Sequence, residues 1–253
     1  AGSRPFSFVV CAAGPARHRA TLTQVKAARR RESYACPIMG VIDPKVTSLF
    51  PTPVVALEIE NAASLSADLR AVIEERERTH PGTVHSNMGG YQSSWDMEQW
   101  GGAPAQRLLG IAKGLADRMT TTADTDVTRG LNRNSAPQPW ICNMWANINR
   151  SGDANDFHSH PGSFWSAVYY VDDGGIPNDP TLGGELEFSD PRGALPMMNA
   201  PHLRMAGSLS AGATERVVPK AGKLVMFPSW LMHQVRPYKG SAVRISIAMN
   251  LAQ

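Results

Sequence analysis

The sequence predicts a mainly β protein: a double-stranded β-helix (jelly roll) barrel with N-terminal helices packed on one outer sheet. From residue 140 onward, short apolar runs of strand length alternate with clusters of Gly, Pro, Asn and Asp, as in antiparallel barrels and sandwiches. Two stretches with helical spacing precede these runs. A chain of 253 residues with 42% hydrophobic content can bury one substantial core and does not require two.

The elements expected before residue 140 are one strand and two helices. Residues 53–59 have the composition of a strand, and apolar residues recur at helical spacing over 64–79 and 104–120. The apolar faces of both helices are interpreted as core that packs against one outer sheet. Residues 85–100 lack a clear period and are interpreted as a loop covering the barrel mouth.

Residues 1–45 differ in composition from the rest of the chain. Residues 1–38 hold seven basic residues and one acidic residue, whereas the remainder holds 18 basic and 21 acidic residues. We interpret 1–45 as a basic N-terminal extension outside the fold; a targeting sequence and residues upstream of the natural start are the alternatives. Residues 46–253 are then predicted to form a single jelly-roll domain, with 46–139 as strand and helical support and 140–253 as the barrel core.

Charge, hydropathy and cysteine content narrow the function classes. The predicted domain is mildly acidic, which disfavours nucleic-acid binding through electrostatics. No run approaches the roughly 18 apolar residues of a membrane-spanning helix, so no membrane partner is expected. Three scattered cysteines are too few for a disulfide framework and favour a reducing compartment, so we expect a cytoplasmic protein. These properties do not decide whether the protein forms a homodimer, so a homodimer is left as an alternative.

Three histidines form a candidate metal site. His158 and His160 are two residues apart in a strand-like run, so their imidazoles point to the same side. His233 ends the apolar run 223–233 and is the candidate third ligand. Three nitrogen donors suit iron(II), zinc or copper. The other histidines of the folded part lack a partner at ligand spacing and are interpreted as structural: His80, His85 and His202.

The last predicted strand, over residues 242–250, carries a candidate anion site. Arg244 and Ser246 lie on one face, and the aliphatic residues between them lie on the other. In one interpretation Arg244 faces solvent. In the other, Arg244 and Ser246 face into the barrel and hold a carboxylate, since a guanidinium donates two parallel hydrogen bonds to such a group.

Taken in order, these motifs resemble the iron(II)- and 2-oxoglutarate-dependent dioxygenase superfamily. A His-x-His-Pro motif at 158–161, a distal histidine, and Arg-x-Ser about ten residues beyond it follow the family order. Residues 169–172 (Tyr-Tyr-Val-Asp), 183–188 (Gly-Gly-Glu-Leu-Glu-Phe) and 219–228 resemble further segments of the prolyl-hydroxylase-like members. The resemblance covers roughly residues 140–251 and is most similar to the bacterial oxygenase group with the His-x-His-Pro motif.

The resemblance implies two cofactors, Fe(II) and 2-oxoglutarate, and a role for each candidate residue. The implied metal ligands are His158, His160 and His233. The implied 2-oxoglutarate contacts are Tyr170, Arg244 and Ser246, with Asn147 and Asn149 near the other carboxylate or the substrate. The implied activity is hydroxylation of an unidentified substrate, a small molecule or a peptide, with release of succinate and CO2. The long insert over 185–215 is the natural place for substrate selectivity.

One position departs from the family pattern, because most members have a carboxylate where this chain has His160. Asp156 shares the strand face of the two histidines, and Glu185 lies in the Gly-Gly-Glu segment, so either could complete the site instead. Two other functions stay open. One is a three-histidine zinc enzyme that activates water for hydrolysis or hydration; the other is a non-catalytic jelly-roll protein that binds a carboxylate.

Overall fold

The computed structural model describes residues 50–121, 138–193 and 214–253; the predicted extension over 1–45 lies outside them. The helices are α1 (Ala62–Thr79), α2 (Met97–Trp100) and α3 (Gly102–Met119), with 3-10 turns at Ile176–Asn178 and Pro180–Leu182. The strands, in chain order, are β1 (Val55–Glu58), β2 (Asn87–Met88), β3 (Tyr91–Gln92), β4 (Ile141–Asn149), β5 (Ala154–His158), β6 (Trp165–Asp173), β7 (Leu186–Ser189), β8 (Thr214–Val217), β9 (Lys223–Pro228), β10 (His233–Val235) and β11 (Arg244–Ala252).

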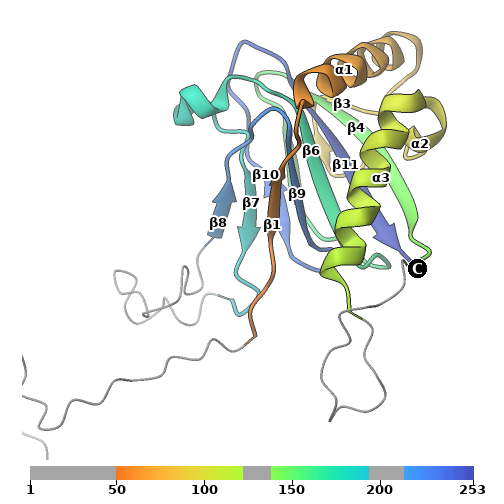
Figure 1. Cartoon of the computed structure of the whole chain (residues 1–253). Helices are drawn as coiled ribbons and strands as arrows, with labels where there is room; N and C mark the ends of the chain where they lie inside the picture. Colours follow the sequence, from red (N-terminus) through yellow and green to blue (C-terminus); the bar gives the residue numbers. More distant parts are fainter. Residues whose placement is uncertain (1–49, 122–137, 194–213) are drawn as a thin grey trace, which may run out of the picture. The chain divides into compact units, whose positions relative to one another are not determined.

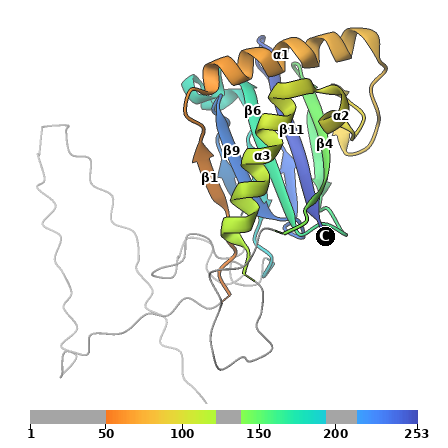
Figure 2. The same cartoon turned by 45° about the vertical axis from the view of Figure 1, so that its right-hand side comes forward.

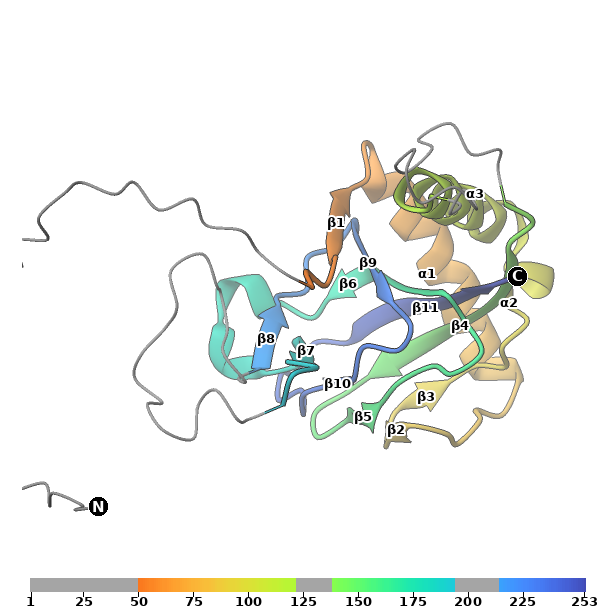
Figure 3. The same ribbon diagram turned by 90° about the horizontal axis from the view of Figure 1, so that it is seen from below.

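The strands form two antiparallel sheets, which confirms the predicted mainly β jelly roll (Figure 1). The larger sheet has the order β1-β9-β6-β11-β4-β3, and the smaller has the order β2-β5-β10-β7-β8. Sequence neighbours are therefore often not sheet neighbours: β11, the last strand, pairs with β4 on one side and β6 on the other. Among the described strands the two sheets face each other without joining into a closed barrel (Figure 3).

Helices α1 and α3 cover the outer face of the larger sheet (Figure 2). Leu65, Leu69 and Ile73 of α1 are buried in one cluster with the outward-facing residues of β11, Ile245 and Ile247 among them. A second, smaller cluster lies between the sheets and includes residues of β6, β7 and β9. The aliphatic face of β11 thus packs under the helices, and its polar alternate residues face the smaller sheet.

The predicted strand over 53–59 and helices over 64–79 and 104–120 are present as β1, α1 and α3, each within two residues. The prediction of an irregular loop over 85–100 is wrong in part, because β2, β3 and α2 lie there. Two-residue strands are too short to show a period, and they exist here because they extend the sheet edges: Asn87 pairs with Asn155, and Tyr91 with Ile148. Of the insert over 185–215, residues 194–213 lie outside the described ranges.

No helix in the described ranges is long and apolar enough to span a membrane.

The packing of α3 against the larger sheet gives a testable stability prediction. Leu108 is fully buried, so Leu108→Ala is expected to lower the free energy of unfolding by about 2–5 kcal/mol, through lost burial and a residual cavity. The control is Ile141→Ala, whose side chain is 66% exposed and should cost less than about 1 kcal/mol. Urea unfolding of both variants measures the difference, and equal losses would contradict this account of the core.

Candidate metal and carboxylate site

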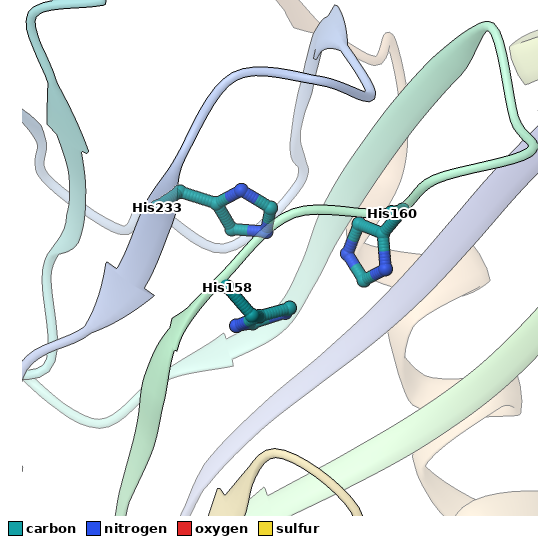
Figure 4. A group of neighbouring side chains, drawn as sticks. All are labelled: His158, His160 and His233. Atoms are coloured by element: carbon teal, nitrogen blue, oxygen red, sulfur yellow. The ribbon is translucent and has the colours of Figure 1, made fainter.

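The three predicted metal ligands lie together between the sheets (Figure 4). His158 ends β5 and His233 begins β10, and the antiparallel pairing of these strands places the two residues opposite each other. His160 follows two residues after β5, where its backbone N–H donates to the carbonyl of Ser229 at 2.9 Å. One candidate ligand atom from each ring lies within 4.8 Å of the others. The fold therefore brings together imidazoles that are up to 75 positions apart in the chain.

The hydrogen bonds of two rings define which nitrogen can bind a metal. Nδ1 of His158 lies 2.6 Å from the carbonyl oxygen of Asp156, and Nδ1 of His233 lies 2.7 Å from that of Leu231. A carbonyl oxygen only accepts, so each Nδ1 must carry the proton and donate it. The neutral ring then has its lone pair on Nε2, which is the arrangement that backbone carbonyls impose on metal-binding histidines.

The surroundings keep all three imidazoles neutral. Burial, together with the neighbouring histidines, lowers the pKa of His160 to about 3 and that of His233 to about 4. Burial also lowers the pKa of His158. Because a metal binds the unprotonated ring, the cluster needs no proton release to act as a ligand set near neutral pH.

No carboxylate joins this cluster among the described residues. Asp156 is exposed, and its Oδ1 accepts a hydrogen bond from the backbone N–H of Phe157. Glu185 is 7% exposed, and its nearest cation is Arg236, with 3.8 Å between Oε2 and Nε. Of the alternatives that the sequence leaves open at this position, the geometry therefore favours His160.

Arg244 is a buried cation beside the histidines. Its side chain is 1% exposed, and it lines the same pocket as the three rings. Nη1 donates to Oδ1 of Asn149 at 2.8 Å and to Oγ of Ser246 at 3.2 Å, whereas Nε and Nη2 have no partner among the described residues. No acidic side chain lines the pocket. Burying a charge without a counter-charge is costly, so this arrangement points to an anionic ligand.

Tyr170 and Ser246 lie beside this guanidinium. The strand register places Ser246 opposite Tyr170 of β6 on one side and Asn147 of β4 on the other. The hydroxyl of Tyr170 is buried without a partner among the described residues, and burial raises its pKa to about 12. It is therefore a neutral donor in the same pocket as Arg244, whose guanidinium carbon lies 5.4 Å from the centre of the Tyr170 ring.

Gly184, before β7, adopts a left-handed backbone conformation close to Ile176 and Arg244. Gly184 has φ +76°, and a side chain there would begin 2.8 Å from Cδ1 of Ile176 and 3.4 Å from Cδ of Arg244. Any other residue would therefore be strained by the positive φ and would crowd the side chain of Ile176. The second glycine of the Gly-Gly pattern noted in the sequence thus has a conformational and packing role beside Arg244.

The two predicted asparagines have different surroundings. Asn149 holds the guanidinium through its amide oxygen and is not part of the pocket lining. Asn147 does line the pocket, and its amide oxygen is buried without a partner among the described residues. Asn149 is thus placed to position Arg244, and Asn147 faces the ligand space.

Sequence reasoning missed several pocket residues. An apolar wall comes from the smaller sheet and β9, and a hydrogen-bonded pair, Ser166 and Asn250, lies on the larger sheet at 2.8 Å. Asn250 could have been found from the sequence, because it lies an even number of residues after Arg244 and therefore on the same face of β11. The residues of the apolar wall could not have been found, because in the sequence they look like ordinary core residues: Leu186, Phe227 and Val235.

Comparison with known proteins agrees with this geometry. Residues 143–250 match the family described as "Putative 2OG-Fe(II) oxygenase". A prolyl-4-hydroxylase from Pseudomonas putida is structurally similar, with TM-score 0.53, 18% identity, and coverage of 80% of this chain and 93% of that one. No curated protein sequence matches the chain.

Two further solved structures share the fold. A prolyl hydroxylase from Trichoplax adhaerens, in complex with a hypoxia inducible factor peptide fragment, has TM-score 0.51 and 14% identity, with 79% and 83% of the two chains covered. The non-heme alpha ketoglutarate dependent carbocyclase SnoK from nogalamycin biosynthesis has TM-score 0.53 and 13% identity, with 79% of each chain covered. At these identities the likeness establishes the fold alone.

Proposed function

We propose that this protein is an iron(II)- and 2-oxoglutarate-dependent oxygenase that hydroxylates a carbon of its substrate, with succinate and CO2 as co-products, because residues 143–250 match the family of putative 2OG-Fe(II) oxygenases. The protein is then an oxidoreductase with two cofactors, Fe(II) and 2-oxoglutarate. The substrate is a small molecule or a peptide. The observation that carries the proposal is a buried arginine with two unused donors in the pocket that three neutral imidazoles share.

The histidine cluster fits iron(II). We assign the metal to the Nε2 atoms of His158 and His233 and to a ring nitrogen of His160, since imidazole is a suitable ligand for this ion. Three neutral ligands leave the double positive charge of the ion uncompensated. The 2-oxoglutarate dianion supplies the compensating charge, so a protein carboxylate is not required for a neutral centre.

The polar groups around Arg244 fit the far carboxylate of 2-oxoglutarate. Nε and Nη2 of Arg244 can donate two parallel hydrogen bonds, and the hydroxyls of Tyr170 and Ser246 can donate one each. Asn149 fixes the guanidinium by accepting from Nη1, which leaves the other nitrogens for the ligand. A dicarboxylate held at this end presents its other end to the histidines.

The two cofactors together supply the oxidising chemistry when they are bound. The chain supplies orientation and a partly apolar pocket. Leu186, Phe227 and Val235 contribute apolar surface to its lining. Because Arg244 is buried, charge-assisted bonds to it are stronger than they would be in solvent.

Anaerobic titration tests this proposal. Adding iron(II) and then 2-oxoglutarate to the full chain is expected to produce a metal-to-ligand charge-transfer absorption band, because the keto acid chelates a metal held by the three histidines. Zinc in place of iron is the control and should give no band. Tight zinc binding without any affinity for 2-oxoglutarate would contradict the proposal and favour a zinc enzyme that activates water.

A further inference from the structure

A second hollow lies beside the proposed active site. It has a volume of about 500 Å³ and is lined by Thr83, Val84, His85, Ser94 and Trp95; we call it the aromatic groove. Ser86, the next residue in the chain, lines the pocket that holds the histidines. The groove and the active-site pocket are therefore neighbours along the segment that precedes β2.

The walls of the aromatic groove are tied to the two sheets. The backbone N–H of Asp156, in β5, donates to the carbonyl of Ser86 at 2.8 Å. The backbone N–H of Met144, in β4, donates to the carbonyl of Trp95 at 2.9 Å. Figure 3 shows the segment with β2 and β3 running along β5 and β4. Since main-chain bonds hold both walls, the groove is formed before any ligand arrives.

A continuous line of rings joins the aromatic groove to the metal site. His85 and Trp95 have ring centroids 5.1 Å apart, Trp95 and Trp145 are 6.4 Å apart, and Trp145 and His160 are 5.8 Å apart. These distances lie in the range of favourable aromatic contacts. The rings that a ligand meets in the groove, His85 and Trp95, are thus connected through the buried Trp145 to a proposed metal ligand.

The groove exposes apolar surface, and its lining contains no charged side chain. Trp95 is 45% exposed and Val84 is 92% exposed, although large apolar side chains gain by being covered. No Asp, Glu, Lys or Arg lines the groove, and the active-site pocket contributes only Arg244, which the proposed function assigns to 2-oxoglutarate. Arg76 donates from Nη2 to Oγ of the lining residue Ser94 at 3.2 Å but does not itself line the groove. A charged substrate group would thus lose hydration without meeting a charged side chain of the lining.

We propose that the aromatic groove binds a neutral, planar aromatic group of the substrate, stacked on Trp95 and directed past Trp145 towards the metal site. The inference rests on the proposed function and specifies the chemical class of its substrate. Trp95 is the residue that selects this class, because its ring is both accessible and in contact with Trp145.

Equilibrium dialysis with indole tests the inference, using the full chain loaded with iron(II) and 2-oxoglutarate under argon. Trp95→Ala is expected to weaken indole binding about tenfold, the fold-change that corresponds to one lost aromatic contact. Trp95→Phe should stay within about threefold of the unmodified protein, because it keeps a ring. The matched control is Trp230→Ala, since Trp230 is 55% exposed and lines neither pocket; it should bind indole unchanged.

Charged relatives of indole complete the design. Tryptamine, a cation, and indole-3-acetate, an anion, are both expected to bind more weakly than indole. Tighter binding of either one, equal weakening by Trp95→Ala and Trp230→Ala, or no saturable indole binding would overturn the inference. The charge-transfer band is recorded on the same samples: a normal band without indole binding rejects the groove alone, whereas its absence from the unmodified protein rejects the proposed function.

Discussion

Replacing Arg244 by alanine is expected to weaken binding of 2-oxoglutarate at least about 30-fold while iron(II) binding is retained. The guanidinium is buried, and two of its nitrogens have no other partner among the described residues. A buried carboxylate that loses its charge-assisted partner costs about 2–5 kcal/mol, which is roughly 30-fold to several thousandfold in affinity. Anaerobic titration with iron(II) already bound measures both affinities in one sample.

Two further arginine variants make this experiment specific. Arg216→Ala removes a side chain that is 46% exposed and paired with Glu187, and it should leave 2-oxoglutarate affinity unchanged. Arg244→Lys retains one charge but loses the paired geometry, so an intermediate loss is expected. Unchanged affinity in Arg244→Ala would show that the diacid binds elsewhere.

The second large effect is expected at the metal. His233→Ala should abolish iron(II) binding, because His233 is 4% exposed and its Nδ1 is already engaged by Leu231, which leaves Nε2 directed at the cluster. The loss should exceed the roughly 10–100-fold that follows removal of a ligand's hydrogen-bond partner. Metal analysis after equilibrium dialysis measures it. Full iron content in this variant would exclude His233 as a ligand.

His160→Asp tests the unusual position of the site. A carboxylate is a good iron(II) ligand, so this variant is expected to retain or improve iron binding if position 160 contacts the metal. The control is His80→Ala: His80 is exposed at the end of α1 and lies outside the cluster, so iron content should not change. Loss of iron in His160→Asp as complete as in His233→Ala would argue against a contact at position 160.

Much of the fold could be predicted from periodicity. The alternation along residues 244–250 predicts one aliphatic and one polar face, and the structure packs Ile245 and Ile247 under the helices while it buries Arg244 between the sheets. The sequence alone could not decide between a solvent-facing and an inward-facing Arg244, since both satisfy the same alternation. The packing of the helices on the aliphatic face of β11 decides it, because the polar face is then turned towards the smaller sheet.

Sequence patterns named the candidate site residues but not the contacts that support them. Strand parity singled out His158, His160 and Ser246, and the end of an apolar run singled out His233. The carbonyl groups of Asp156 and Leu231, which orient two of the rings, are backbone atoms and leave no trace in residue identity. The contact between Trp95 and Trp145 joins residues 50 positions apart, so it depends on tertiary structure that local patterns do not encode.

The central claim is that three imidazoles hold one iron ion and that Arg244 holds the far end of 2-oxoglutarate. The most direct test is a crystal structure of the protein grown under argon with both cofactors, with anomalous diffraction recorded at the iron edge. We predict one anomalous peak between the ring nitrogens of His158, His160 and His233, and a diacid whose far carboxylate lies against Arg244. A peak bound by other residues, or a diacid away from this guanidinium, would contradict the account.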